Sequence, residues 1–331
     1  YYICRRNLTD KSIAMKRKNV KLMMLAALFP MLCWAAGEQP ISLGTPTGEI
    51  QGRVMLPDVE RPPVVLIIAG SGPTDMDGNS LLGAVTLKNN SLKLLAEGLA
   101  RRGIASLRYD KRGIASSAAA GKEEKDLRFD DYVADARGWI ELLSEDSRFS
   151  GIFVVGHSEG SLIGMLASEG NAKVKGFVSI AGAGHPAYEI IETQMSNQPA
   201  EVRQLVKNIN DSLRAGKAVN DVPVGLMALY RPSVQPYLMS WYRYDPREVV
   251  ARLEQPVLLV QGDKDIQVSV GDAEALKAAQ PQAELYLIEN MNHVLKSCDT
   301  VDAGVQQATY TNPDLPVVEE LLNVIEKFIK P

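Results

Sequence analysis

Chemistry is first suggested by residues 156–160, Gly-His-Ser-Glu-Gly, which present a serine between two glycines. The apolar run Ile152–Val155 precedes them and the helix-compatible run Ser161–Ala167 follows. A buried strand, a G-x-S-x-G turn and a helix are the context of a nucleophile elbow, whose serine hydroxyl stands exposed on a strained turn. Glycines remove the Cβ atoms that would clash there. We therefore interpret Ser158 as a nucleophile, against the simpler interpretation of a glycine-rich turn between a strand and a helix.

A serine hydroxyl is a weak nucleophile and needs a general base. The histidines are His157, His185 and His293. His293 follows the predicted strand Glu284–Ile288, and the carboxyl ends of parallel strands share one sheet edge, so it should lie on the same side as Ser158. The side chain of His157 should point away from its neighbour, and His185 is expected in a loop or lid. His293 is therefore the preferred base.

The base needs an orienting carboxylate, expected between serine and histidine in the chain. The segment Gly262–Val268 follows a predicted strand and contains two candidates, Asp263 and Asp265. Asp265 is further round the turn and can better face the loop of His293, so we prefer it. The other aspartate would be a turn or helix-capping carboxylate.

Attack on an acyl group forms an oxyanion, which needs two preorganised N–H donors worth roughly 3 kcal/mol each. One is expected to be the backbone N–H of Glu159, directly after the predicted nucleophile. The second is expected in the glycine-rich loop Ala69–Pro73 after another strand. Ser71 is the preferred donor in this loop, and Gly70 is the alternative.

Strands and helices alternate along most of the chain, as in a parallel, doubly wound sheet. Continuous apolar runs predict strands that are covered on both faces. The expected strands are Glu49–Leu56 (antiparallel), Val64–Ile68, Ile104–Tyr109, Ile152–Val155, Val174–Ile180, Pro256–Val260 and Glu284–Ile288. The expected helices are Leu92–Ala100 with an N-cap from Asn90 and Ser91, Phe129–Leu143, Ser161–Ala167, Val270–Ala279 and Leu315–Ile329.

The alternation stops between residues 184 and 254. This region predicts helices over Ala187–Met195 and Glu201–Leu213, followed by a stretch rich in Met, Trp and Tyr. We interpret 184–254 as a helical cap inserted into an α/β core of residues 37–183 and 255–331.

The first 36 residues differ from the rest in charge and hydropathy. Met15 precedes a basic stretch ending at Lys21, then an apolar run and small residues, which are the parts of a secretory signal peptide. We expect 1–14 to be upstream translation, 15–36 to be a signal peptide, and the chain to be exported to the periplasm or secreted. The apolar stretch Leu22–Ala36 is shorter than the roughly 20 residues that span a bilayer. An uncleaved anchor is the alternative.

Residues 37–331 contain 29 Lys and Arg and 39 Asp and Glu, a net charge of −10. An acidic chain without basic clusters is a poor ligand for nucleic acids and anionic membranes, so we expect neither as a stable partner. Cys298 is the one cysteine in this range, which leaves no pair for a disulfide. We expect no cofactor and no metal: no dinucleotide fingerprint is present, and Thr74–Asn79 has its glycine too early for a calcium loop.

Four segments in order resemble the α/β-hydrolase superfamily, closest to its esterase and serine-aminopeptidase-like branch with a helical cap. They are Ala69–Pro73, Tyr109–Gly113, Gly156–Gly160, and Gly262–Val268 together with His293. The resemblance implies an α/β-hydrolase fold with a mostly parallel sheet. It also implies a triad of Ser158, Asp265 and His293, with oxyanion donors at Ser71 and Glu159. Two departures are Ala69-Gly70, where many relatives have His-Gly, and Ala115, where a further glycine is usual.

We expect an exported serine hydrolase that cleaves small carboxylic esters through an acyl-enzyme, with apolar cap residues lining its pocket. An aminopeptidase or amidase is the first alternative, because the same machinery cleaves amides. It would need a cap carboxylate to hold the substrate amine, and Glu189, Glu192 and Glu201 are available. The second alternative is a non-catalytic binding protein on a hydrolase fold.

Overall fold

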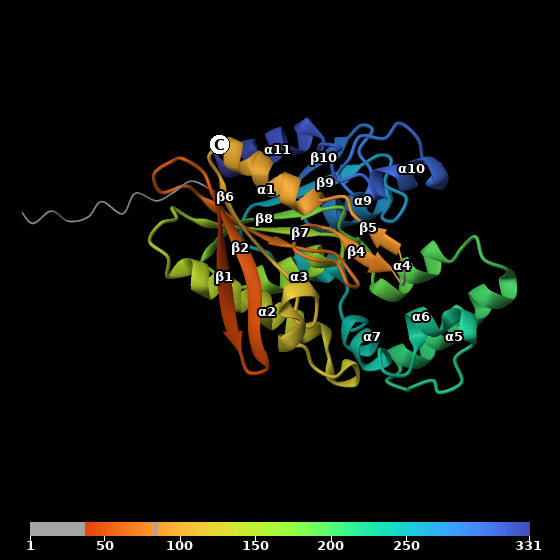
Figure 1. The fold of residues 1–331 in the computed structure, drawn as a ribbon. Coiled ribbons are helices and arrows are strands. Elements are labelled where there is room, and N and C mark those ends of the chain that lie inside the picture. The colour runs from red at the N-terminus through yellow and green to blue at the C-terminus, as the bar shows by residue number, and fades with distance from the viewer. Residues whose placement is uncertain (1–36, 83–84) are drawn as a thin grey trace, which may run out of the picture. The chain divides into compact units, whose positions relative to one another are not determined.

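The central sheet has eight strands in the order β1-β2-β6-β3-β7-β8-β9-β10 in the computed structural model, which describes residues 37–82 and 85–331. From β6 to β10 the strands are parallel, while β2 is antiparallel to β6 and β1 to β2. The strands are β1 (Gly37–Thr45), β2 (Gly48–Leu56), β3 (Val64–Ile68), β6 (Ala105–Tyr109), β7 (Ile152–His157), β8 (Val174–Ile180), β9 (Val257–Gly262) and β10 (Glu284–Ile288). This mostly parallel, doubly wound sheet confirms the predicted fold class (Figure 1).

The inner parallel strands are buried on both faces, as their continuous apolar runs predict, whereas the edge strand β10 is only partly buried. All five residues of β3 and all six of β9 are buried. Ile68 at the end of β3 pairs with Gly156 of β7, and Gly262 at the end of β9 pairs with Ile288 of β10. The loops that follow each pair therefore leave the sheet side by side at its carboxyl edge.

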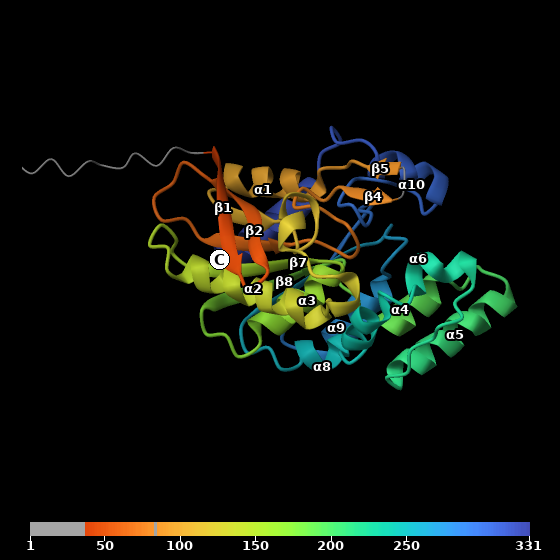
Figure 2. The same cartoon turned by 60° about the horizontal axis from the view of Figure 1, so that its bottom comes forward.

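Helices cover both faces of the sheet. On one face α1 (Ser91–Arg101) packs beside α11 (Glu319–Ile329), where Gly98 and Leu322 are in contact. On the other face lie α2 (Phe129–Ser144), α3 (Glu159–Ser168) and α9 (Val270–Ala279), with the short 3₁₀ helices η1 (Ala115–Ala120) and η2 (Glu124–Asp126) before α2. Figure 2 shows α1 on one side of the strands and α2, α3 and α9 on the other.

The helices that follow β8 gather beyond the carboxyl edge of the sheet (Figures 1 and 2). Buried Asn210 ties them together, because its Oδ1 accepts hydrogen bonds from the hydroxyls of Tyr230 (2.9 Å) and Tyr242 (2.8 Å). They rest on the core where Trp241 stacks on Phe129, with ring centroids 5.6 Å apart. The elements are α4 (Ala187–Gln194), α5 (Ala200–Arg214), η3 (Val224–Leu226), α6 (Met227–Tyr230) and α7 (Gln235–Trp241). The next helix, α8 (Pro246–Val250), falls in the predicted cap range but packs against α3 and α9.

Several local features differ from the sequence-based predictions. Asn90 precedes α1 but makes no side-chain cap; its Oδ1 instead accepts from the amide of Asn79 (3.0 Å). The last helix begins at Glu319 rather than Leu315, because the preceding residues include a proline and Val317 forms a β-bridge with Lys296. The sequence patterns also gave no signal for β1, for the hairpin of β4 (Ser80–Leu82) and β5 (Val85–Leu87), or for α10 (Ala303–Tyr310).

The predicted signal peptide, residues 15–36, and the segment 1–14 before it lie outside the described residues. Export therefore stays a prediction. Within the described part of the chain, no helix is both long and apolar enough to cross a bilayer.

Candidate active site

The turn from β7 to α3 places Ser158 in a strained backbone conformation. Its φ is 54° and its ψ −123°, a region that residues with a side chain rarely adopt. A Cβ at Gly156 would lie 2.3 Å from the carbonyl oxygen of Gly160, and a Cβ at Gly160 would lie 2.3 Å from that of Ile68. The two glycines are thus required by backbone contacts within the turn and against β3.

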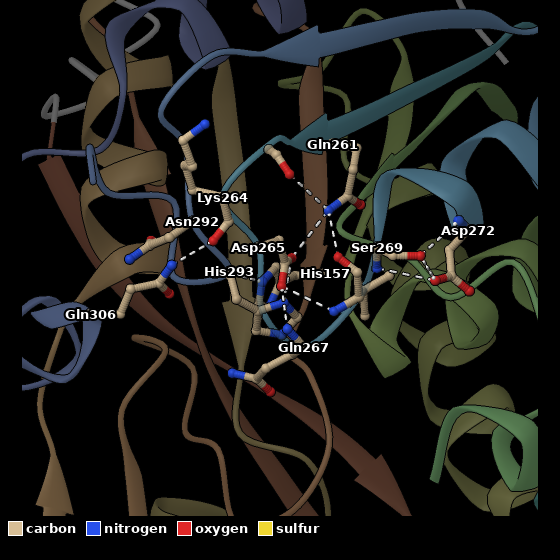
Figure 3. A network of polar contacts seen from close by, with 12 residues as sticks. His157, Gln261, Lys264, Asp265, Gln267, Ser269, Asp272, Asn292, His293 and Gln306 are labelled. Carbon is tan, nitrogen blue, oxygen red and sulfur yellow. Dashed lines mark hydrogen bonds and ion pairs between the residues drawn. The ribbon is translucent and has the colours of Figure 1, made fainter. Parts of the chain in front are cut away.

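His293 and Asp265 meet where the loops after β9 and β10 run together (Figure 3). The Nδ1 of His293 lies 2.7 Å from Oδ2 of Asp265, and both side chains are buried. The backbone N–H groups of Gln267 (2.8 Å) and Val268 (3.0 Å) donate to the other carboxylate oxygen. Burial alone would raise the pKa of Asp265, but His293 and these N–H groups hold it below its usual value. The carboxylate is therefore ionised at neutral pH.

The neighbouring Asp263 has a different environment. Its carboxylate accepts a hydrogen bond from the backbone N–H of Asn290 (2.6 Å) and pairs with Lys264 (2.6 Å). It thus ties the loop after β9 to the loop after β10 without contacting His293.

A supporting residue that the sequence did not suggest is buried Gln261. Its Nε2 donates to Oδ2 of Asp265 (3.2 Å) and to the carbonyl of Val268 (3.0 Å).

Ser158 and His293 line one cavity of about 240 Å³, which we call the elbow cavity. Gly70 and Ser71 of the loop after β3 line it too. Because Nδ1 of His293 faces Asp265, its Nε2 is the nitrogen left to exchange a proton with a bound molecule.

Both predicted oxyanion donors lie beside Ser158. A Cβ at Gly70 would be 3.1 Å from the Cβ of Ser158, so the loop after β3 runs against the elbow. Among the hydrogen bonds of the described residues, the backbone N–H groups of Ser71 and Glu159 have no acceptor. The Glu159 N–H is at the first position of α3, where helical N–H groups lack partners and attract negative charge.

Comparisons with known proteins agree with this architecture. A family model described as serine aminopeptidase, S33, matches residues 89–223. The structure is similar to Est1E from Butyrivibrio proteoclasticus, solved with ferulic acid, at 17% identity over 87% of this chain and 97% of Est1E, with a TM-score of 0.59. It is also similar to the α/β hydrolase GrgF from a Penicillium species, at 18% identity over 88% of this chain and 98% of GrgF, with a TM-score of 0.58. The chain has the α/β-hydrolase fold.

Esterase EstD of Thermotoga maritima is similar to this chain, at 27% identity over 280 residues. The match includes 82% of this chain and 64% of EstD. The chain thus spans less than two thirds of the length of that curated relative.

Next to the elbow lies a buried polar network that the sequence did not reveal. Lys111, in the loop after β6, donates to the carbonyl of Gly70 (2.6 Å) and to Oε2 of Glu159 (2.9 Å). Tyr237 of α7 donates to Oε1 of the same carboxylate (2.5 Å). Burial and the nearby Glu159 raise the pKa of Tyr237 well above its usual value, so its hydroxyl stays protonated and can donate. The segment Tyr109–Gly113 had been singled out only through its family resemblance.

Beyond the elbow, a larger hollow of about 460 Å³ lies under the inserted helices; we call it the cap cavity. Ser158 lines it as well as the elbow cavity. Its walls are mainly apolar and include Leu162 of α3, Ile191 of α4, and Leu238 and Trp241 of α7. The predicted nucleophile therefore stands between a small cavity beside His293 and a large apolar one beneath the cap.

The other two histidines have structural contacts. His185 Nδ1 lies 3.0 Å from Oδ1 of Asp272, which also accepts from the N–H of Gly184 (3.0 Å) and so joins the start of the cap to α9. His157 is buried, and its Nε2–H donates to the carbonyl of His293 (2.8 Å). Burial lowers the pKa of His157 to about 4, with the His293 ring as the next cause, so His157 is neutral at pH 7.

Neutral His157 should make the fold sensitive to acid. The unfolded chain takes up a proton at this residue near pH 6.5, whereas the folded chain does so only near pH 4. Stability is therefore lost as the pH falls from 6.5 to 4, by roughly 2–3 kcal/mol at pH 4.5. The variant His157→Gln keeps an N–H donor but does not titrate. Denaturant unfolding at pH 7.5 and 4.5 should show a smaller loss in the variant, and equal losses would contradict this role.

Two further sequence features, the run Thr74–Asn79 and Ala115, are explained by the local backbone structure. Asp75 Oδ1 accepts from the N–H groups of Asp77 (2.9 Å) and Asn79 (2.8 Å), so the acidic run Thr74–Asn79 is a self-bonded turn. No group of metal-ligating side chains was found among the described residues. Ala115, at the position where relatives usually have glycine, has a φ of 41°, a conformation that glycine adopts more readily.

Proposed function

We propose that this chain is a serine hydrolase that cleaves carboxylic esters with Ser158 as nucleophile, His293 as general base and Asp265 as the orienting carboxylate. The observation that carries the proposal is that His293 pairs with buried Asp265 and lines the same cavity as Ser158. The match to EstD, which is named as an esterase, adds support.

In the acylation step, Ser158 Oγ attacks the ester carbonyl carbon while His293 Nε2 takes its proton. The carbonyl oxygen becomes an oxyanion that the N–H groups of Ser71 and Glu159 stabilise. The intermediate collapses, the bond to the alcohol oxygen breaks, and His293 returns the proton to that oxygen. Water then attacks the acyl-enzyme by the same route and releases the acid.

We assign the two halves of the ester to the two cavities by the position of His293. His293 lines the elbow cavity but not the cap cavity, and the group that protonates the leaving alcohol must be next to it. The alcohol half therefore belongs in the smaller elbow cavity, where Thr74, Asn89 and Tyr310 offer polar contacts. The acyl half belongs in the larger, apolar cap cavity.

The amidase alternative has less support. An aminopeptidase would need a carboxylate facing the substrate amine, yet the described lining of the cap cavity has no cap carboxylate. Glu189 lines a separate polar hollow, Glu192 accepts from the amide of Asn210 (3.0 Å), and Glu201 is exposed. The one carboxylate on the cavity wall, Glu159, is already bonded to Lys111 and Tyr237.

A panel of nitrophenyl esters from acetyl to hexanoyl tests the proposal. Each methylene buried in the cap cavity contributes up to about 0.8 kcal/mol, so kcat/KM should rise up to about fourfold per methylene. Ala187 lines this cavity, and Ala187→Leu should lower hexanoyl turnover roughly tenfold while acetyl turnover changes little. The same replacement at exposed Ala200 is the matched control.

The panel also separates the alternatives. Faster cleavage of aminoacyl amides than of any ester would favour the aminopeptidase. Absence of turnover, together with no labelling of Ser158 by a fluorophosphonate, would favour the non-catalytic binding protein.

A further inference from the structure

Lys111 is a buried cation whose hydrogen-bond partners, Gly70 and Glu159, lie beside Ser158. Its side chain is 1% exposed and that of Glu159 2%. Its Nζ lies 2.6 Å from the carbonyl oxygen of Gly70 and 2.9 Å from Oε2 of Glu159, and 4.9 Å from the ring centroid of Tyr132. Burying an ion pair costs several kcal/mol per ion, and apolar replacements are often as stable. The pair is therefore poorly explained by stability alone.

The contact with Gly70 has a consequence for the next N–H group. In a trans peptide the C=O and the following N–H are held in one plane and point in opposite directions. Lys111 draws the Gly70 carbonyl into the protein, so the N–H of Ser71 is turned away from the lysine. That N–H has no acceptor among the described residues, and its loop lies against Ser158.

The contact with Glu159 joins the second N–H donor to the same lysine. The side chain of Glu159 holds Lys111, while its backbone N–H opens α3 beside Ser158. Tyr237 from α7 donates to the remaining carboxylate oxygen. One buried cation thus links the loop after β3, the elbow and the cap, which are far apart in the chain.

We propose that Lys111 is a positioning residue that sets the geometry of the oxyanion hole, with Tyr237 coupling that geometry to the cap. The inference rests on the proposed function, because it assigns the Ser71 and Glu159 N–H groups to an oxyanion. Lys111 itself does not touch the substrate. It fixes the Gly70–Ser71 peptide before substrate binds, so no reorientation is needed as negative charge develops.

The test compares two double variants, each of which removes both charges of a buried ion pair, with two single variants. Lys111→Met with Glu159→Gln removes the contact with Gly70, whereas Glu159→Gln alone keeps it. The control pair is Arg112→Met with Asp135→Asn, a neighbouring buried ion pair (Arg112 Nε to Asp135 Oδ2, 2.7 Å) with no contact to the elbow. Tyr237→Phe removes only the hydroxyl from the cap. Thermal unfolding establishes that each variant is folded.

The double variant at Lys111 should lower kcat roughly 10- to 100-fold with KM within about twofold, because a misplaced donor weakens binding of the transition state more than of the substrate. The single Glu159→Gln should lose less than about fivefold, and Tyr237→Phe a similar amount. The Arg112 control pair should lower the melting temperature but leave kcat within about twofold. Equal losses of kcat in the two double variants, or an unchanged kcat at Lys111, would overturn the inference.

A crystal structure of the Lys111 double variant shows, without any substrate, whether Lys111 fixes the orientation of the Gly70–Ser71 peptide. A Gly70 carbonyl that has rotated supports the inference, and one that keeps its direction overturns it. Ester hydrolysis by the wild type and by Ser158→Ala, measured in parallel, reports separately on the proposed function. A wrong inference about Lys111 can therefore be distinguished from a wrong proposal about ester hydrolysis.

Discussion

Replacing Ser158 with alanine is expected to lower kcat for ester hydrolysis at least about 10⁴-fold, because the acyl-enzyme can no longer form. Substrate binding should persist, since both cavities are intact and only one oxygen atom is removed. Steady-state kinetics with a nitrophenyl ester, combined with fluorophosphonate labelling, measures this effect. A variant that retains more than about 1% of wild-type activity would exclude Ser158 as the nucleophile.

Ser158→Gly separates the catalytic role of this position from its strain. Glycine adopts the observed φ of 54° without a Cβ penalty. Its unfolding free energy should therefore exceed that of Ser158→Ala by about 1 kcal/mol, although both are inactive. Urea unfolding of the two variants checks the difference. A less stable glycine variant would mean that the elbow is not strained at this residue.

Asp265→Asn is expected to lower kcat about 10⁴-fold, the second largest effect. The amide would present an N–H to Nδ1 of His293, so the ring proton would move to Nε2 and the ring could no longer accept the proton of Ser158. Asp263→Asn is the matched control, because Asp263 holds the N–H of Asn290 and not the histidine. It should stay within a few-fold of the wild type. Equal losses at the two positions would show that loop integrity, not orientation of His293, is responsible.

The same variant should alter stability in a pH-dependent way. The pKa of Asp265 is lowered in the folded chain: burial raises it, but His293 and the backbone N–H groups of Gln267 and Val268 outweigh that cause. A depressed pKa gives stability that is present above the unfolded pKa, about 3.9, and lost as the pH falls through the folded value. The stability difference between wild type and Asp265→Asn should therefore be largest near neutral pH and shrink below about pH 4.

The sequence alone was sufficient to predict those features that depend on residues close together in the chain. The elbow could be identified because its two glycines avoid clashes with backbone atoms of the turn itself and of the adjacent strand. The parallel strands could be placed because burial on both faces demands continuous apolar runs. The order of serine, aspartate and histidine segments then placed all three at one sheet edge, since parallel strands end together.

Contacts between residues that are distant in the chain could be assigned only from the tertiary structure. Asp263 and Asp265 are two residues apart, and only the packed loops after β9 and β10 show that Asp263 bonds to Asn290 and Asp265 to His293. The three candidate glutamates of the cap could not be ranked until the helices were folded, and none of them lines the cap cavity. Only a family resemblance marked Lys111 in the sequence, because its hydrogen-bond partners, Gly70 and Glu159, come from two distant segments of the chain. The strained turn at Ser158 follows from five consecutive residues, whereas the loop Ala69–Pro73 is held beside it only when Gly70 and Glu159 both contact Lys111.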